Sequence, residues 1–345
     1  MDLIQFPAEW HSQSAIQITW PHKNSDWAYI LDEVTHFYIH LSKVILKHTR
    51  LLIVCHDVKE VVDYFTATER KKLILTEIES NDTWARDHGP ISVYINGKPA
   101  IYDFGFNAWG LKFAANFDNQ ITSKLFEKNI FTPEVSYYNH LNFILEGGAI
   151  ETDGEGTLLT TSQCLLSPNR NQPLTKEEID KYLKEKLGIT QVLWLDSGYL
   201  EGDDTDNHID TLARFCNKKT IAYVQCVDTN DEHYEDLKKM EKELAAFRTL
   251  DGEPYTLIPL PMADPLYVEE NRLPATYANF LILNSAILMP TYNSNKDSIA
   301  INQLKKVFPD KEIVGIDCRT LIKQHGSLHC ITMQYPERFL YFTKG

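Results

Sequence analysis

The sequence predicts a mixed α/β fold, built from five repeats of one kind of module within a single domain of residues 1–345. Short runs of β-branched and aliphatic residues recur at intervals of 56 to 65 residues, and a segment of helical periodicity precedes each run. A polar loop follows each run, often with a pair of short strands after it. Because no Gly-, Pro- or Ser-rich linker separates the modules, one domain is favoured over two. An ordinary open α/β sheet would show similar spacing. The residues in the loops therefore have to discriminate between an open sheet and a fold of repeated modules.

The predicted strands are short and rich in residues that suit a pleated, half-buried surface. The five recurring runs are Leu73–Leu75, Glu134–Tyr138, Val192–Leu195, Thr256–Leu260 and Glu312–Ile316. Three β-hairpins are expected between them, and Asn-Gly at residues 96–97 is a strong signal for a two-residue turn. The hairpins pair Ile91–Ile95 with Ala100–Phe104, Ala149–Thr152 with Thr157–Thr161, and Phe280–Leu283 with Ala286–Met289.

Helical periodicity is clearest in Thr175–Leu187, where Thr175 and Glu178 have the spacing of a capping box. Tyr234–Phe247 and Ser298–Val307 show a similar pattern. Near the N-terminus, apolar side chains between residues 27 and 45 fall on one helical face.

Composition excludes several classes of partner. The chain has 34 Lys and Arg against 48 Asp and Glu, a net charge of −14, so no basic surface is available for nucleic acid. The N-terminus is too polar for a signal peptide, and no stretch approaches the roughly 18 apolar residues of a membrane span. We therefore expect a cytoplasmic protein with neither a nucleic-acid nor a membrane partner. The six cysteines contain no Cys-x-x-Cys and no zinc-site spacing, so reduced thiols and no metal are expected.

Chemically active side chains are concentrated in the loops that follow the five strand-forming runs. Together these loops contain carboxylates, histidines, an asparagine and one cysteine. Functional groups that follow successive strands converge on one end of a fold. We therefore expect one site, formed by residues 81–90, 145–151, 198–210, 273–279 and 324–330.

The combination of residues in these loops favours guanidine chemistry. A cysteine with a histidine indicates thiol nucleophilic catalysis. A cysteine protease needs one orienting Asn or Asp, and further acids would raise the thiol pKa and weaken the nucleophile. Several acids make sense if the substrate is a cation, because a guanidinium is planar and accepts bidentate carboxylate partners. An acidic chain is compatible with a cationic ligand, although net charge alone is weak support.

Some individual residues have two interpretations. His208 and Asp210 would face the site together if they lie on a strand, where residues i and i+2 share a face. By the same geometry His329 would point away from Cys330 and is interpreted as structural. Trp84 taken alone is more typical of a core residue, and Trp109 would either wall the site or simply pack. The remaining polar residues are Asp82 and Asp206, interpreted as loop acids, and His325, which is undecided.

Motifs in family order across nearly the whole chain resemble those of agmatine deiminases, within the guanidine-modifying superfamily that includes bacterial peptidylarginine deiminase. The matching stretches are Phe6–Trp10, Trp84–Pro90, Phe106–Gly110, Leu145–Gly148, Asp153–Thr157, Asp204–Asp210, Arg214–Phe215 and His329–Thr332. The resemblance implies a five-bladed, pseudo-symmetric α/β propeller.

The resemblance also implies roles for individual residues. By motif position Cys330 is the nucleophile, His208 the general acid and base, and Glu146 the acid that supports it. Asp87 and Asp210 form the guanidinium clamp. The residues expected to contact the substrate besides the clamp are Trp84, Trp109 and, on a looser match, Asn279.

The implied reaction is hydrolysis of agmatine to N-carbamoylputrescine and ammonia through a covalent amidino-cysteine, a step of putrescine biosynthesis in polyamine metabolism. No metal or organic cofactor is implied. The alternatives are the same deimination on free arginine or peptidyl-arginine, and a non-catalytic guanidine-binding relative. A homodimer is compatible with the sequence, which contains no feature that tests it. Candidates for binding the agmatine ammonium are Glu9, Asp204 and Asp206.

Two departures from the family pattern concern the site. The family usually has glycine before the histidine of its His-x-Asp, where this chain has Asn207. The family usually reads Gly-Gly-Gly-Asn before the last hydrophobic-His-Cys, where this chain has Gln324–Ser327. The second change lies beside Cys330. The sequence therefore defines the reaction at the guanidinium better than it defines the part of the substrate beyond the guanidinium.

Overall fold

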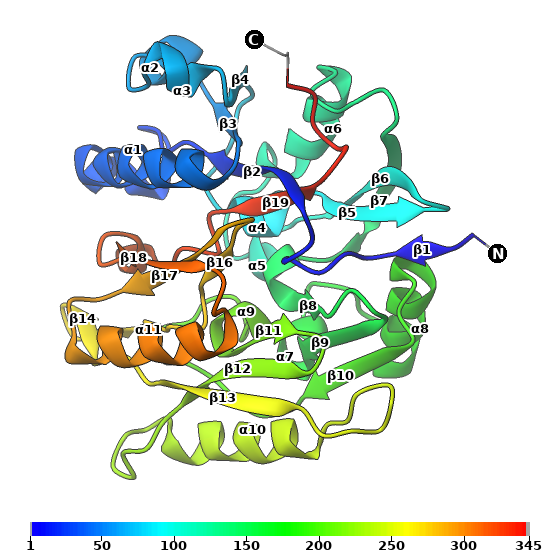
Figure 1. The fold of residues 1–345 in the computed structure, drawn as a ribbon, viewed down its shortest axis with the longest axis vertical. Coiled ribbons are helices and arrows are strands. Elements are labelled where there is room, and N and C mark those ends of the chain that lie inside the picture. Colours follow the sequence, from blue (N-terminus) through cyan, green and yellow to red (C-terminus); the bar gives the residue numbers. More distant parts are fainter. Residues whose placement is uncertain (1, 343–345) are drawn as a thin grey trace.

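The five predicted runs all form strands in the computed structural model, which describes residues 2–342 (Figure 1). Each pairs in parallel with the strand that precedes it in the chain. Their bounds are β4 (Leu73–Glu77), β7 (Ser136–Ile144), β10 (Gln191–Leu195), β13 (Thr256–Pro261) and β18 (Glu312–Asp317).

One arrangement recurs in the sheets, namely an antiparallel pair, a helical connection, and a third strand parallel to the second. It occurs as β5–β6–β7, β8–β9–β10, β11–β12–β13 and β16–β17–β18. The three predicted hairpins are confirmed as β5–β6, β8–β9 and β16–β17. The further bounds are β5 (Ile91–Ile95), β6 (Lys98–Gly105), β8 (Ile150–Thr152), β9 (Thr157–Thr161), β11 (Ala213–Asn217), β12 (Thr220–Gln225), β16 (Leu281–Ile282) and β17 (Ala286–Thr291).

The fifth sheet joins the two ends of the chain. Its order is β19–β2–β3–β4, in which β19 is antiparallel to β2 and the other pairs are parallel. The antiparallel pair β19–β2 and the parallel strand β3 therefore repeat the arrangement of the other four modules. The predicted run at Leu73–Leu75 belongs to β4, an additional strand at the edge of this sheet. The remaining bounds are β1 (Ile4–Gln5), which pairs with β5, β2 (Gln13–Thr19), β3 (Leu51–Cys55), β14 (Leu266–Val268), β15 (Asn271–Leu273) and β19 (Met333–Pro336).

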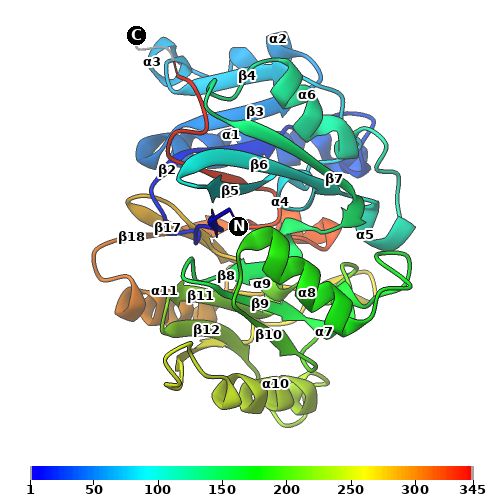
Figure 2. The ribbon, with the colours of Figure 1, turned by 90° about the vertical axis from the view of Figure 1, so that its right-hand side faces the viewer.

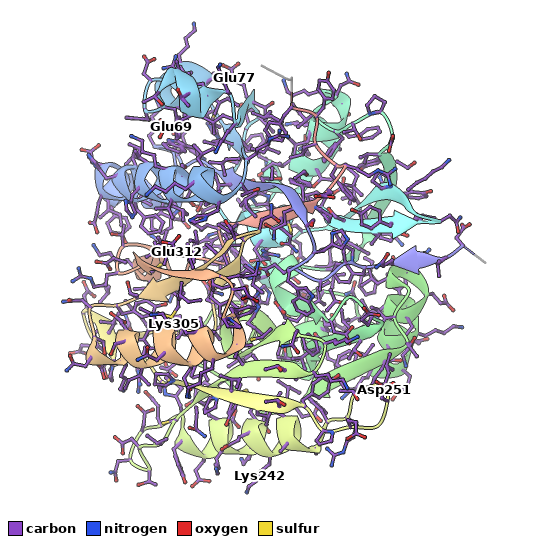
Figure 3. All side chains as sticks on the ribbon, viewed as in Figure 1. Glu69, Glu77, Lys242, Asp251, Lys305 and Glu312 are labelled. Carbon is purple, nitrogen blue, oxygen red and sulfur yellow. The ribbon has the colours of Figure 1, made fainter. Side chains whose placement is uncertain are left out.

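Longer helices surround the strands, as Figures 1 and 2 show for α1, α6, α8, α10 and α11. The predicted capping box is present at α8, where Thr175 accepts from the Glu178 N–H and Glu178 accepts in return. Charged side chains such as Lys242 and Lys305 lie on the exposed faces of α10 and α11 (Figure 3). The helix bounds are α1 (Leu31–His48), α6 (Ile121–Glu127), α8 (Lys176–Leu187), α10 (Tyr234–Ala246) and α11 (Asn295–Val307).

Short helices carry the connections between these elements. The 3-10 turns are η1 (Asp26–Ile30), η2 (Asp118–Gln120), η3 (Gly147–Ala149) and η4 (Leu321–Gln324). The short α-helices are α2 (Val58–Val62), α3 (Ala67–Arg70), α4 (Ala85–His88), α5 (Ala108–Leu111), α7 (Ser162–Leu165) and α9 (Ile209–Leu212).

The core forms between each sheet and its covering helix. In α1 the buried side chains Val34, Tyr38, Leu41 and Ile45 recur at three- and four-residue spacing, which confirms the predicted apolar face. Strand pairings within residues 2–342 stay inside each sheet and do not link the sheets into a closed barrel. The mixed α/β fold and its repeated module are therefore observed, while the closed five-bladed arrangement stays a prediction.

Candidate active site

A cavity of about 940 Å³ lies where three of the five predicted loops meet, namely residues 81–90, 198–210 and 324–330, and neither 145–151 nor 273–279 contributes to its lining. Its lining comes from the loops after β4, β10 and β18 and from the segment after β6, and Cys330 is part of it. Carboxylates dominate the charged lining, and no Lys or Arg is found among the described residues that line it. The acids are Asp26, Asp82, Asp87, Asp118, Glu201, Asp203, Asp204 and Asp236.

Cys330 lies in a turn after η4 with only 7% of its surface exposed. Its Sγ is 3.4 Å from Asn279 Oδ1 and 4.0 Å from Asp210 Oδ2. Burial raises the pKa of the Cys330 thiol well above its usual range, and the charges of Asp210 and Asp87 raise it further. A positive charge beside this thiol would counteract both carboxylates and favour the thiolate.

Asp87 is placed by α4, which follows Trp84. Its Oδ2 accepts from Trp109 Nε1 at 3.0 Å, and its Oδ1 accepts from the Gly148 N–H at 3.0 Å. His208 Nδ1 lies 3.6 Å from Oδ1. Burial raises the pKa of Asp87 well above its usual range, with Asp210 and Glu146 adding to the effect. A cation bound here would reverse that shift and favour the carboxylate.

Asp210 has one engaged oxygen and one unpaired oxygen. Its Oδ2 is 2.7 Å from His329 Nδ1, whereas the buried Oδ1 has no hydrogen-bond partner within residues 2–342. Burial raises the pKa of Asp210, but the hydrogen bond and charge of His329 outweigh burial, so this pKa lies below its usual value. Asp210 is therefore ionised and retains a free acceptor beside Cys330.

The predicted strand through His208 and Asp210 is wrong. His208 is the N-cap of α9, and Asp210 lies in that helix. Asp206 and Asn207, with φ of 66° and 63°, turn the chain before the helix begins. Asn tolerates this left-handed conformation, which explains how Asn207 stands where the family usually has glycine. Both predicted side chains still lie near Asp87 or Cys330, but a turn and not β-alternation brings them there.

Glu146 and His208 are buried together. Arg170 Nε donates to Glu146 Oε1 at 2.9 Å, and His208 Nε2 has no partner within the described chain. Burial lowers the pKa of His208, with a partial opposing effect from Glu146 and Asp210. His208 is therefore a neutral imidazole with one nitrogen available for proton transfer.

Two tryptophans wall the cavity. Trp84 and Trp109 are 6% and 7% exposed, and their ring centroids are 6.4 Å apart. Trp84 packs so closely over Gly326 that a Cβ on that residue would lie 2.1 Å from the indole. Gly326 is the one glycine of the departing Gln324–Ser327 segment, and the indole accounts for its retention. The neighbouring His325 has a φ of 63° and also lines the cavity.

Asn279 holds the segment that carries the cysteine. Its Oδ1 accepts from the His329 N–H at 2.8 Å and from the Cys330 N–H at 3.3 Å, and its Nδ2 donates to the Asp210 carbonyl at 3.3 Å. Asn279 is fully buried and does not line the cavity. Its amide is directed at the backbone of the two neighbouring segments, so the expected contact of Asn279 with the substrate stays a prediction.

The three candidates for the ammonium of the substrate's tail differ in position. Asp204 lines the cavity. Asp206 does not, because it binds Arg170 NH1 at 2.6 Å and Lys112 Nζ at 2.9 Å. Glu9 lies beneath the cavity and binds Arg214 and His329.

Sequence reasoning missed Arg170, which fixes Glu146 and the turn before His208. Its NH2 donates to the Thr205 carbonyl at 2.8 Å, while NH1 binds Asp206. Arg170 lies outside every motif and every predicted loop, so no sequence signal identified it. The expectation that His329 points away from Cys330 is also wrong, because residues 328–331 form a turn and are not extended. His329 Nδ1 and Cys330 Sγ both approach Asp210 Oδ2.

Two buried groups of side chains have donors close enough to hold a metal, with donor atoms within 4.8 Å of one another. They are Glu146 with Cys164 and His208, and Glu9 with Glu151 and His329. Arginine already neutralises the carboxylates of each group, through Arg170 in the first and Arg214 in the second. Both groups therefore serve as ion-pair networks. Separately, no helix within residues 2–342 has the length and hydropathy to cross a membrane.

Comparisons with known proteins agree on a family. The model of the family described as Porphyromonas-type peptidyl-arginine deiminase matches residues 5–336. A Porphyromonas gingivalis structure named "Putative Arginine Deiminase" is 54% identical, with a TM-score of 0.95 over 98% of this chain and 100% of that one. A cysteine-to-serine variant of the C. jejuni agmatine deiminase with substrate bound is 40% identical, with a TM-score of 0.90 over 99% and 98%. A Marinomonas relative named "Putative agmatine deiminase" is 32% identical over 98% of this chain and 96% of its own length.

Proposed function

The chain belongs to the Porphyromonas-type peptidyl-arginine deiminase family, and on that premise we propose that it hydrolyses agmatine to N-carbamoylputrescine and ammonia. Deimination of a guanidine is the activity that the names of its relatives share. One observation carries the choice of agmatine: Cys330 faces a cavity lined by eight carboxylates and, within the described residues, by no Lys or Arg. Such a cavity suits a substrate with a positive charge at both ends.

The guanidinium is held by Asp87 and Asp210 in this proposal. The unpaired Oδ1 of Asp210 accepts one guanidinium N–H, and Asp87 accepts another. The positive charge then lies beside Cys330 and counteracts the two carboxylates that raise the thiol pKa. Substrate binding thereby promotes formation of the thiolate.

Proton transfer is assigned to His208, whose free Nε2 takes the proton of Cys330 as Sγ bonds to the guanidinium carbon. His208 then gives this proton to the departing ammonia as the C–N bond breaks, which leaves a cationic amidino-thioether. Water adds to the carbon while His208 accepts its proton, and the C–S bond breaks to restore the thiol. Over both steps guanidinium and water become the ureido group and ammonium.

Free arginine is the second candidate, favoured by the name of the Porphyromonas gingivalis relative. Its carboxylate would have to enter a cavity without a lining Lys or Arg, and juxtaposed like charges are unfavourable by several kcal/mol. We therefore expect kcat/KM to be at least about tenfold higher for agmatine than for arginine. Peptidyl-arginine, which lacks an ammonium on the same tail, is expected to be poorer than agmatine as well.

The test is an assay of the purified chain with agmatine, arginine and arginine-containing peptides, measuring ureido product and ammonia. Turnover of agmatine with the highest kcat/KM supports the proposal. Turnover of arginine or a peptide without turnover of agmatine would refute the substrate assignment while leaving deimination intact. No turnover of any guanidine would support the non-catalytic alternative.

We also propose that residues 1–345 form one catalytic domain whose five modules are the blades of a pseudo-symmetric propeller. The recurrence of the same strand order in the sheets and the span of the family match, residues 5–336, support this arrangement. An experimental structure in which the modules divide into separate units would contradict it.

A further inference from the structure

His329, the neighbour of Cys330, has a carboxylate oxygen at each of its ring nitrogens. Nδ1 lies 2.7 Å from Asp210 Oδ2, and Nε2 lies 2.8 Å from Glu9 Oε2. The ring is 1% exposed. A ring nitrogen can donate to a carboxylate only when it carries a proton, and a neutral imidazole carries one proton on its two nitrogens. One of the two contacts therefore requires either a second proton on His329 or a protonated carboxyl.

Glu9 is not the group that holds this extra proton. Its Oε1 accepts from the Ile282 N–H at 2.6 Å, and its Oε2 also accepts from Arg214. Burial raises the pKa of Glu9, but the charges of Arg214 and His329 outweigh burial and hold it far below its usual value. Gln13 Nε2 donates to the carbonyls of Glu9 and Ile282 at 2.8 Å and fixes this segment against β16. Glu9 is thus an ionised acceptor in a fixed position.

Asp210 is the other carboxylate, and its free Oδ1 is the atom assigned above to the guanidinium. The contact of Oδ2 with His329 at 2.7 Å restricts rotation of this carboxylate, and Cys330 Sγ lies 4.0 Å from the same oxygen. We propose that His329 is a positioning residue: held as an imidazolium between Glu9 and Asp210, it orients Asp210 so that one oxygen stays available to the substrate beside Cys330.

The charges around His329 are consistent with a cation there. The groups that face it are the carboxylates Glu9 and Asp210, with Glu151 of β8, Arg214 of β11 and Arg86 of α4 behind them and Cys330 beside it. With an imidazolium, three positive groups face these three carboxylates, and Asp87, which interacts with Asp210, adds a further buried acid. A neutral His329 would remove one of the positive groups from this acidic surrounding, which is costly. Glu9, which is 320 residues from His329 in the sequence, thus acts on the site through His329.

The protonation state is tested on the whole wild-type chain by ¹H–¹⁵N correlation spectra of ¹⁵N-labelled histidine. We expect His329, assigned by loss of its signals in His329→Gln, to carry protons on both nitrogens at the pH of the kinetic assay, as its two carboxylate contacts require. A bare ring nitrogen under these conditions would overturn the proposal. This measurement needs no substrate and is therefore independent of the proposed function.

The positioning role rests on the proposed function and is tested by kinetics with agmatine. His329→Gln and Glu9→Gln are each expected to lower kcat/KM by roughly 10- to 100-fold, a typical cost of removing a supporting partner of a site residue. Because Glu9 acts through His329, the double variant is expected to be no worse than His329→Gln alone. Multiplied losses in the double variant would refute the connection between the two residues.

A matched control is Asp103→Asn, which removes a buried carboxylate in β6 that accepts from Tyr137 at 2.6 Å and does not line the cavity. It is expected to lower the melting temperature without lowering kcat/KM. Wild-type kcat/KM in His329→Gln would overturn the inference while leaving deimination in place. If the wild-type chain turns over no guanidine, the proposed function fails, and the spectra still decide the state of His329.

Discussion

Two groups of buried carboxylates lie close together in this molecule, and they differ in whether a guanidinium is present between them. Beneath the cavity, Glu9 and Glu151 both bind the guanidinium of Arg214, which also donates to the Phe280 carbonyl at 2.6 Å. Asp87, which lines the cavity, and Asp210, whose Oδ2 is 4.0 Å from Cys330 Sγ, have no arginine bound to either within residues 2–342. The lower group is a complete carboxylate–guanidinium clamp. In the upper group only Asp210 has a partner of the chain, His329, and the guanidinium is still to be supplied.

The difference separates structural acids from acids available to a ligand. Carboxylates with a resident cation have their buried charge compensated in the folded chain. Carboxylates without one must be protonated, hydrogen-bonded or neutralised by a ligand, as the raised pKa of Asp87 shows. By the same reasoning, Asp206 is a structural acid because Arg170 and Lys112 bind it. Asp204 is available to a ligand because it lines the cavity.

The largest effect is expected at Cys330, the proposed nucleophile beside the upper group. Cys330→Ser should lower kcat for agmatine by at least about 10⁴-fold, because the hydroxyl is a much poorer nucleophile in this environment. Binding should persist, since both clamp carboxylates remain, and the cysteine-to-serine variant of the C. jejuni relative is described with substrate bound. Stopped assays and calorimetric titration measure the two properties. Activity of Cys330→Ser within tenfold of wild type would contradict the covalent mechanism.

The next largest effect is expected in the lower group. Arg214→Leu leaves Glu9 and Glu151 buried without their cation, which should lower the free energy of unfolding by about 3–5 kcal/mol. Urea denaturation measures this loss. The matched control is Arg338→Leu, which removes an exposed pair with Glu134 and should have a much smaller effect on the free energy of unfolding. Equal losses in the two variants would show that Arg214 is not a structural cation.

Removing one carboxylate of the upper group should weaken catalysis and leave stability nearly unchanged. Asp87→Asn keeps the shape of the side chain but loses a charged acceptor, and hydrogen bonds to charged groups contribute about 1.5–3 kcal/mol. We therefore expect kcat/KM for agmatine to fall by roughly 10- to 150-fold. Because the substitution relieves repulsion with Asp210 and Glu146, the melting temperature should not decrease. A large loss of stability would place Asp87 with the structural acids.

The smallest effect concerns the pH dependence of binding, which involves two acids that line the cavity. Burial, with a contribution from Asp26, raises the pKa of Asp82 to about 7, and burial raises the pKa of Asp118 to about 7. Both groups are protonated below this pH and anionic above it, so they attract a cation more strongly as the pH rises. The Kd of Cys330→Ser for agmatine should therefore decrease about fivefold between pH 6 and pH 8.

Asp82→Asn in the same background tests this pH dependence, because it removes one of the two groups and should reduce the change in Kd. A Kd that rises with pH, or that keeps its full pH dependence in Asp82→Asn, would contradict a role for these acids in binding. Asp103→Asn, which alters a buried acid outside the cavity, serves as the control.

Local features of the fold were predictable because short-range interactions set them. The turn at residues 96–97 and the capping box at α8 depend on residues within a few positions of each other, and both are observed. The interpretation of His208–Asp210 as a strand failed because two positive-φ residues and Arg170, some 36 residues away, determine that turn. Pairing of β19 with β2 also escaped prediction, since it joins opposite ends of the chain.

The sequence by itself predicted the class of chemistry, deimination of a guanidine. A cysteine, a histidine and an excess of acids in successive loops indicate a nucleophile and a cationic substrate, because side-chain chemistry does not depend on the fold. Only the tertiary structure decided which acids remain available. Glu9 and Asp204 are both acidic residues and cannot be distinguished in the sequence. In the structure Arg214 and His329 bind Glu9, whereas Asp204 lines the cavity. The reason is that burial and cation pairing arise from contacts between distant segments, which no local pattern encodes.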